Sequence, residues 1–556
     1  MRLRTYSVAM LVAVALAPAA SGQPAPSPPR LREIVDVTVA NVDVVVTDAK
    51  GNRVEGLTRD DFELLENGKP VKISNFAEIS EKTISTESSP APDALPAASA
   101  EAAPTPAPRR RVVVFVDLMT VRGIRRRNAI EEISGFLDQL EPGDERMVVS
   151  WDDAAVKVEI PPEADESTAR AVLEKLVRRR SATMNRSIPM TASFRQHLVT
   201  GRKNRLLRSV HAVRALLTQM KPLNGRKVLI LVTAGFPLRP GREIMMTPWY
   251  DEDTRAVRLY DGFVVEAQRL LDSLGDAANA AGVTLYTIHG LGATTRAAIG
   301  PKLVDPGLGE TAGFGTLILP GIGVDPIYVD NSAQGLKLVA EKSGGVATAR
   351  TNDIAGALRS IKEDLASYYS LGYHLSGALD AERNVEVRMR DPSLTARART
   401  SIVVGSPREH AADAIVASLA LPESPWGTGP GNELGISLVA DRPVRAARGT
   451  RKIPLDVRIP LAPLSFEEEE DGLVAHLTLF IGAADAEKTL SSVERFEHVV
   501  RIARADLERP GAHYTYGFDV ELRTRTASNE IAVAVVDDGT GLTGHSRVTI
   551  GSAAKR

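Results

Sequence analysis

Two hydrophobic patterns alternate along the middle of this chain. Short apolar runs, such as Val112 to Val116 and Val228 to Val232, are typical of buried strands. Segments with apolar residues three or four positions apart follow them and are typical of amphipathic helices. The clearest such helix carries one apolar face, made of Leu206, Val210, Val213, Leu217 and Met220. Strands that alternate with helices predict an α/β domain with a doubly wound parallel sheet, covered on both faces.

Strict alternation of apolar and polar residues flanks this central region on both sides. Before it, residues 34 to 79 alternate in short runs, and Asn67-Gly68 lies between two of them, which predicts a hairpin in a small antiparallel β domain. After it, runs such as Leu455 to Ile459 and Ile531 to Val536 predict a C-terminal β-sandwich-like domain. The predicted fold is therefore multidomain, with a Rossmann-like α/β domain between two β domains.

These patterns also predict where the parts of the chain begin and end. The first 22 residues combine basic residues, an apolar stretch and small residues, as secretory signal peptides do. Two insertions, at 181–201 and 292–330, interrupt the α/β region. The predicted parts are a signal peptide (1–22), an N-terminal β domain (31–80), a Ser, Pro and Ala-rich linker (81–110), the α/β domain (111–405), a helical connector (406–433) and the C-terminal β domain (434–552).

Composition narrows the possible functions. A formal net charge of −2 argues against general nucleic-acid binding, and the absence of cysteine excludes thiolate zinc sites and cysteine nucleophiles. After the signal peptide, the sequence contains no apolar stretch of the roughly 20 residues that a membrane span needs. We therefore expect a secreted or periplasmic protein without a transmembrane anchor.

Candidate chemistry gathers where three predicted strands end. Asp117, Thr233 and His289 each follow an apolar run, and the carboxyl ends of parallel strands are where open α/β sheets place their ligands. One interpretation is an extracytoplasmic hydrolase that uses these three side chains in one crevice. However, no Gly-x-Ser-x-Gly elbow or His-Glu-x-x-His motif is present, and a histidine at a strand end is usually structural.

Three stretches of the sequence together resemble a known family. They are Gly56 to Pro70, the strand that ends at Asp117, and Asp364-Leu365-Ala366-Ser367-Tyr368-Tyr369-Ser370-Leu371-Gly372-Tyr373. In this order they are similar to the von Willebrand factor A-related proteins abundant in Acidobacteria, a secreted family with a small β domain ahead of an A-type domain. The resemblance spans roughly residues 34 to 404 and implies an A-type fold for the α/β domain.

The resemblance also implies a metal-ion-dependent adhesion site, which this sequence lacks in large part. Family members that bind metal carry Asp-x-Ser-x-Ser after the first strand and a later aspartate. Here Asp117 is present, but Met119 and Val121 occupy the serine positions and Ala234 occupies the later aspartate position. The family's threonine has a candidate in Thr183. Because Mg²⁺ needs near-octahedral oxygen coordination, we expect a degenerate site with no cofactor, in which Asp117 is at most a weak metal ligand.

An arginine offers a physical substitute for the missing ion. Arg122 and the run Arg125 to Arg127 follow Asp117 at the start of a helix, where cations are unfavourable unless an anion offsets them. One interpretation is that one of these arginines pairs with Asp117. The other is that they are solvated surface residues.

The expected function is therefore non-enzymatic binding of an extracytoplasmic protein or envelope component. Recognition would use the loops around the strand ends, including 119–127, 181–201, 236–253 and 292–330. Trp249 and Tyr250 either anchor a partner or cap the sheet locally. The predicted binding face consists of Asp117, Thr120, Arg122, Thr233, Trp249 and Tyr250.

Overall fold

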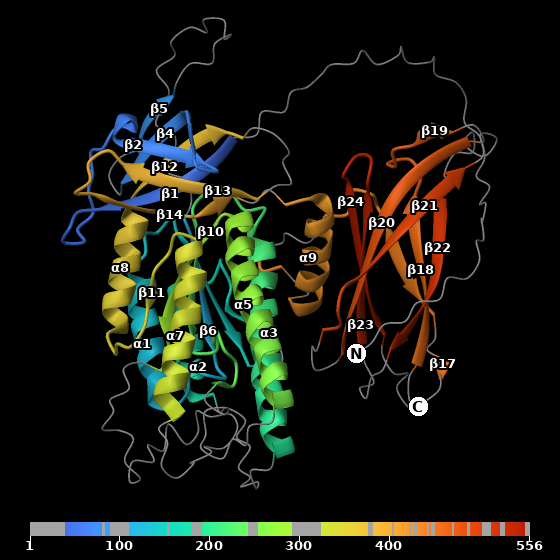
Figure 1. Ribbon diagram of the computed structural model, residues 1–556, viewed down its shortest axis with the longest axis horizontal. Coiled ribbons are helices and arrows are strands. Elements are labelled where there is room, and N and C mark those ends of the chain that lie inside the picture. The colour runs from blue at the N-terminus through green and yellow to red at the C-terminus, as the bar shows by residue number, and fades with distance from the viewer. Residues whose placement is uncertain are drawn as a thin grey trace, which may run out of the picture. The chain divides into compact units, whose positions relative to one another are not determined.

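The computed structural model contains two compact units, one made of Val39–Val404 with Glu423–Thr428 and one made of Gly405–Pro422 and Gly429–Arg556 (Figure 1). The structure describes residues 39–80, 84–88, 110–152, 156–179, 192–242, 254–291, 324–375, 382–402, 405–421, 424–426, 431–441, 444–445, 451–469, 472–485, 490–502, 513–522 and 529–550. The predicted signal peptide and most of the predicted linker lie outside these residues, but Ile84–Ser88 of the linker forms a strand that pairs with the preceding one. Among the helices described, none is long and apolar enough to cross a bilayer.

A six-stranded mixed sheet forms the centre of the first unit. Its strands are β6 (Arg111–Asp117), β7 (Glu145–Trp151), β8 (Val156–Ile160), β9 (Lys227–Thr233), β10 (Val283–His289) and β11 (Ala347–Thr348). They lie in the order β11-β10-β9-β6-β7-β8, and all neighbours are parallel except β7 and β8. The parallel strands predicted at β6, β7, β9 and β10 are present, whereas β8 and β11 were not predicted. The direction of winding reverses between β6 and β9, which makes this point a topological switch point.

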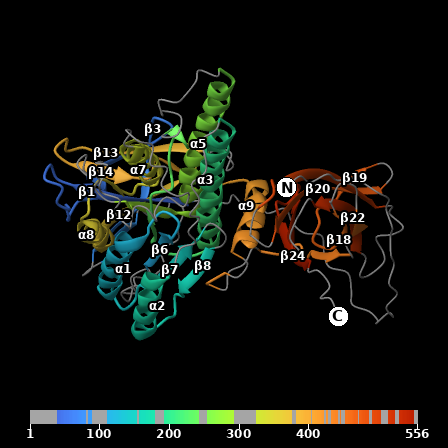
Figure 2. The same ribbon diagram turned by 90° about the horizontal axis from the view of Figure 1, so that it is seen from below.

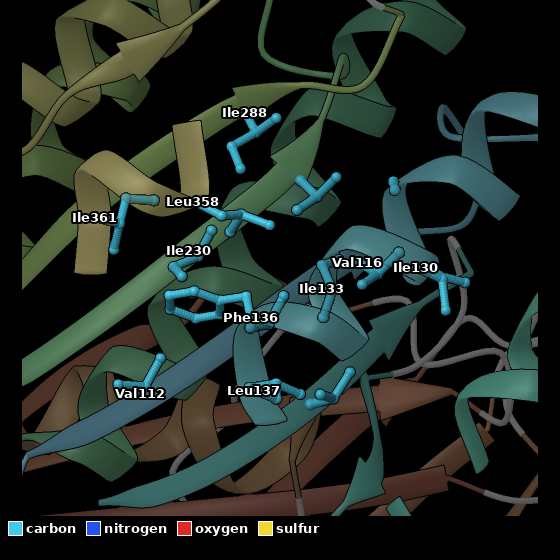
Figure 3. Close-up of a cluster of buried hydrophobic side chains, with 14 of the residues drawn as sticks. Val112, Val116, Ile130, Ile133, Phe136, Leu137, Ile230, Ile288, Leu358 and Ile361 are labelled. Atoms are coloured by element: carbon cyan, nitrogen blue, oxygen red, sulfur yellow. The ribbon is translucent and has the colours of Figure 1, made fainter. Parts of the chain in front are cut away.

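Helices cover both faces of this sheet (Figure 2). One layer contains α1 (Gly123–Asp138), α2 (Glu166–Arg178) and α8 (Ile354–Ala366), and the other contains α3 (Ala192–Met220), α5 (Thr254–Ala281) and α7 (Val324–Lys342). Figure 3 shows how Ile133 and Phe136 of α1 pack with Val116 and Ile230 of the sheet in one buried cluster. Their neighbours in the strands, such as Phe115 and Leu229, are also buried. Strands buried on both faces explain the continuous apolar runs of the sequence.

The second part of this unit, which we call the β subdomain, differs from the prediction. Its sheets are β14-β1-β12-β4-β5 and β15-β13-β2-β3. Its strands are β1 (Val39–Thr47), β2 (Phe62–Glu66), β3 (Lys69–Val71), β4 (Ile73–Ser80), β5 (Ile84–Ser88), β12 (Ser367–His374), β13 (Arg383–Met389), β14 (Thr395–Ala398) and β15 (Ser401–Ile402). Residues 367–402 were predicted to belong to the α/β domain. In the structure β12 lies between β1 and β4, because its apolar side chains complete the core of the β subdomain.

The hairpin predicted at Asn67-Gly68 is confirmed. β2 and β3 pair antiparallel, with Glu66 opposite Lys69, so the turn between them contains only Asn67 and Gly68. Asn67 has φ 50° and Gly68 has φ 77°. A two-residue turn with both φ values positive matches the right-handed twist of the flanking strands, and Asn and Gly adopt it at little cost.

The second unit consists of two antiparallel sheets and one helix. The first sheet contains β16 (Ser437–Ala440), β17 (Val444–Arg445), β18 (Arg451–Pro460) and β22 (His513–Leu522); the second contains β19 (Glu467–Glu469), β20 (Gly472–Asp485), β21 (Glu494–Ile502), β23 (Asn529–Asp537) and β24 (Thr543–Ile550). Leu455 and Leu479 represent the core that the sheets share. The helix predicted within the connector is present as α9 (Pro407–Ala420), and its Ile415 and Leu419 pack on the second sheet of this unit.

Candidate functional site

The candidate site lies at the switch point, where β6 and β9 end side by side. Asp117 is the last residue of β6 and Thr233 is the last residue of β9. The hydroxyls of Thr233 and Thr120 both donate to Asp117 Oδ2, each at 2.6 Å. Asp117 Oδ1 accepts from the backbone N–H of Met119 at 2.9 Å and of Thr120 at 3.2 Å. We call Asp117, Thr120 and Thr233 the threonine–aspartate network.

The loop after β6 is held by a local turn that the sequence specifies. An aspartate side chain that accepts from the backbone two and three residues ahead forms an Asx turn. The N–H of Val121 also donates to the carbonyl of Asp117 at 2.9 Å, which closes the loop before α1 begins at Gly123. This turn brings the Thr120 side chain back over Asp117 and next to Thr233.

Backbone groups after β9 complete the network. The N–H of Ala234 donates to Thr120 Oγ1 at 3.0 Å, and the N–H of Gly235 donates to Thr233 Oγ1 at 2.9 Å. A Cβ at Gly235 would lie 3.1 Å from Asp117 Oδ2, so the close approach favours glycine there. Each hydroxyl therefore accepts from the backbone and donates to the carboxylate, and both oxygens of Asp117 are satisfied.

Burial and hydrogen bonding act on Asp117 in opposite directions. The residue is 1% exposed. Desolvation raises the pKa of its carboxyl, while donation from Thr120, Thr233 and the Met119 N–H, and the positive charge of Arg205, lower it; burial prevails and the pKa is raised. Arg205 belongs to α3 and was not predicted to act on the site. It lies 88 residues after Asp117 in the chain, and no local sequence pattern links the two.

The positions expected for metal ligands do not fit a metal ion. Val121 is fully buried, and a Cβ on Gly290 would lie 2.3 Å from Val121 Cγ2, so an apolar contact fills the space of one expected serine. Ala234, at the expected aspartate position, is also fully buried. Among the described residues, no group of three or more His, Cys, Asp or Glu side chains is placed to hold a metal ion. With both oxygens of Asp117 occupied, a cation there would have to break the threonine–aspartate network.

The structure does not support an arginine as the partner of Asp117. Arg122 is 2% exposed, and its Nη2 lies 3.7 Å from the sulfur of Met119. Arg126 instead donates to the carbonyls of Val177 and Arg179 after α2. In the described structure the donors to the Asp117 carboxylate are hydroxyls and backbone amides, which does not favour the interpretation that an arginine of this run pairs with it. Arg122 and Arg126 are also buried, which does not fit the alternative of solvated surface residues.

His289 lies next to the network and outside it. It is the last residue of β10 and is opposite Thr233 in the parallel ladder. The side chain is 2% exposed, and neither ring nitrogen has a hydrogen-bond partner within the described part of the chain. Desolvation first, and then the positive charges of Arg125 and Arg350, lower its pKa to about 4. The Thr233 hydroxyl donates to Asp117 and not to His289, so the three side chains do not form a hydrolytic relay.

This buried histidine should make stability depend on pH. An unfolded histidine gains a proton below its ordinary pKa of 6.5, whereas folded His289 stays neutral down to about 4. Its contribution to the free energy of unfolding is therefore complete above pH 6.5 and is lost as the pH falls toward 4. The loss between pH 7 and pH 5 is on the order of 2 kcal/mol.

We expect His289→Leu to lose less stability than the wild type over this interval, as measured by urea unfolding at both pH values. Asp117 has a raised pKa and contributes with the opposite sign, but it is present in both proteins, so the difference between them isolates His289. Equal losses of stability between pH 7 and pH 5 in the two proteins would contradict the lowered pKa of His289.

Several predicted site residues lie outside the described part of the chain. They include Trp249 and Tyr250 of the predicted binding face and the candidate ligand Thr183. The predicted insertions fall there in large part, at residues 180–191 and 292–323. The structure therefore brings together Asp117, Thr120 and Thr233 and places Arg122 beside them.

The third sequence motif joins the two parts of the first unit. Asp364, at the end of α8, is fully buried and pairs with Arg53 and Arg397 of the β subdomain. The hydroxyl of Tyr286 in β10 donates to Asp364 Oδ2 at 2.7 Å. Burial first, and then the charge of Asp364, raise the pKa of Tyr286 to about 12, so this hydroxyl keeps its proton. We call these four residues the Asp364 cluster, and its role is structural.

Comparisons with known proteins add no assignment. No protein-family model matches this chain, and no curated protein matches it. Among solved structures, 50 chains match. One is the X-ray structure of a Northeast Structural Genomics Consortium target, with 12% identity and a TM-score of 0.16, over 23% of this chain and 93% of that one. Similarity at this level carries no argument about the fold or the function of this protein.

Proposed function

We propose that this is a non-enzymatic binding protein with a von Willebrand factor A-type α/β domain and a degenerate metal site. The strand order, with a reversal between β6 and β9 and one antiparallel edge strand, supports the A-type interpretation. The threonine–aspartate network is the observation that carries the proposal. It satisfies Asp117 with the protein's own hydroxyls at the position where a metal-dependent domain would hold its ion.

The hydrolase alternative receives no support from the same geometry. A nucleophilic threonine needs a base that accepts its proton. The Thr233 hydroxyl donates to Asp117, but that carboxylate also accepts from Thr120 and from two backbone N–H groups, and both Asp117 and Thr233 are 1% exposed. His289 is buried too, and its pKa is lowered to about 4. These side chains serve the packing of the strand ends.

The proposed partner is an extracytoplasmic protein or envelope component that docks on the switch-point edge. The signal-like N-terminal sequence supports a secreted or periplasmic location. Ile124, the second residue of α1, has 50% of its surface exposed next to the network, and Arg127 is exposed one turn further. An apolar side chain beside a cation is a common centre for protein recognition.

We expect Ile124→Asp to reduce capture of the partner about tenfold, because a carboxylate would be buried in the interface. The measurement is quantitative pull-down from the source organism's cell-envelope extract with the immobilised full-length mature chain. Val265→Asp is the matched control, since Val265 is 47% exposed on α5 within the same unit. Both variants should keep wild-type thermal stability. Equal capture by all three proteins would refute this binding face.

A further inference from the structure

The second unit contains a cavity that the proposed function does not use. Its volume is about 420 Å³. It is formed by the first turn of α9, the strands β19, β20 and β21, and the turn after β23. Glu467 and His476 line it and are exposed, so the cavity opens to solvent. All these elements belong to one compact unit.

The charges that line this cavity are mainly negative. They are the carboxylates of Glu467, Glu497 and Asp538 and a single cation, Arg408. Arg408 Nε pairs with Asp538 Oδ1 at 2.9 Å, and the Thr478 hydroxyl donates to both oxygens of Asp538 at 3.0 Å. Arg408 therefore offsets the charge of Asp538 first and acts more weakly on Glu497, so the three carboxylates still outnumber the one arginine of the described lining.

The neighbouring groups do not remove this negative charge. Glu497 pairs with Arg495 at 2.5 Å, but both side chains are largely exposed and such a pair is weak. His498 also lines the cavity, and burial lowers its pKa, so it stays neutral at neutral pH. The cavity thus offers two carboxylates to a ligand, with one of them shared with a surface arginine.

Apolar side chains complete the wall. Val474 is buried and Val499 is 39% exposed, whereas Leu477, which also borders the cavity, has its side chain in the core between the two sheets. The described lining contains no Phe, Tyr or Trp, so it lacks the large ring on which a sugar would stack. An aliphatic floor with carboxylates at the opening matches a side chain with an alkyl stem and a charged head.

We propose that this cavity binds a basic side chain, lysine or arginine, from a peptide segment of a partner protein. The alkyl stem would contact Val474 and Val499, and the cationic head would lie between Glu467 and Glu497. Charge complementarity selects this occupant over an anionic or uncharged one. The proposal rests on the second unit alone and is independent of the function proposed for the α/β domain.

The test is an NMR titration of the full-length mature chain labelled on Val and Leu methyl groups. The probes are Nα-acetyl-lysine methylamide and its uncharged analogue Nα-acetyl-norleucine methylamide. We expect the lysine probe to shift the methyl signals of Val474 and Val499, and the norleucine probe to shift them at least threefold less at equal concentration. Added salt should weaken the lysine response, since the attraction is electrostatic.

Two matched variants complete the test. Glu497→Gln should weaken the lysine probe about threefold to fivefold, as expected for one partly exposed charge pair. Glu494→Gln makes the same change on β21 outside the cavity lining and should leave the affinity unchanged. Equal responses to both probes, an unchanged affinity in Glu497→Gln, or no response at all would overturn the proposal.

Discussion

We expect Asp364→Asn to lower the free energy of unfolding of the first unit by about 4 kcal/mol. Asp364 is fully buried and is the shared anionic partner of Arg53 and Arg397. The substitution keeps the volume of the side chain but leaves two cations against a neutral amide. Removal of one partner from a buried ion pair typically costs about 3–5 kcal/mol. Tyr286 would also lose its charged acceptor.

Urea unfolding followed by tryptophan fluorescence measures this effect selectively. The chain has three tryptophans, Trp151, Trp249 and Trp426, and all belong to the sequence ranges of the first unit. Glu341→Gln is the control, since its pair with Lys337 is largely exposed and contributes less than about 0.5 kcal/mol. If Asp364→Asn unfolds at the same urea concentration as the wild type, the Asp364 cluster does not hold the unit together.

The second large effect is expected at the threonine–aspartate network. Thr233→Val keeps the shape of the side chain but removes the hydroxyl that donates to Asp117 and accepts from the Gly235 N–H. A buried carboxylate and a buried N–H each lose a partner, so we expect a loss of about 3 kcal/mol. Thr233→Ser retains the hydroxyl and should lose only about 1 kcal/mol, for the missing methyl group.

The same variants distinguish this network from a metal site. We expect the loss in Thr233→Val to be equal in EDTA and in millimolar Mg²⁺, because hydrogen bonds within the protein hold Asp117. Calorimetric titration of the wild type with Mg²⁺ or Mn²⁺ should show no binding tighter than about 1 mM. A loss that disappears in EDTA, or a stronger affinity for either ion, would contradict a degenerate site.

The hydrophobic pattern of the sequence predicted the positions of individual helices, strands and turns better than it predicted which strands pair. The apolar run that ends at Thr233, the helical face of Leu206 to Met220 and the Asn67-Gly68 turn are determined by residues close in sequence, and all are present. The pairing of β12 with β1 joins residues more than 300 positions apart, as for Val39 and His374. A strand's period shows that it has a buried face but not which strand it pairs with.

The candidate site shows the same division. The ends of β6 and β9 were predicted to meet, because carboxyl ends of parallel strands share one edge. Met119, Val121 and Ala234 indicated the loss of metal ligands. The hydroxyl donors were not predicted, because they depend on the turn that returns Thr120 to Asp117 and on the register between β6 and β9. The arginine whose charge lowers the pKa of Asp117 is Arg205 of α3, and the sequence offered no signal for it because α3 lies far from Asp117 in the chain.

The return of the chain through β12 has a mechanical consequence. β1 precedes the α/β domain and is flanked in its sheet by β12 and β14, which follow that domain. A force that pulls Val39 and Ile402 apart therefore acts on the hydrogen bonds of these ladders. The α/β domain does not bear this force while the ladders are intact. The crevice between β6 and β9 should keep its geometry under load until β1 is pulled from its neighbours.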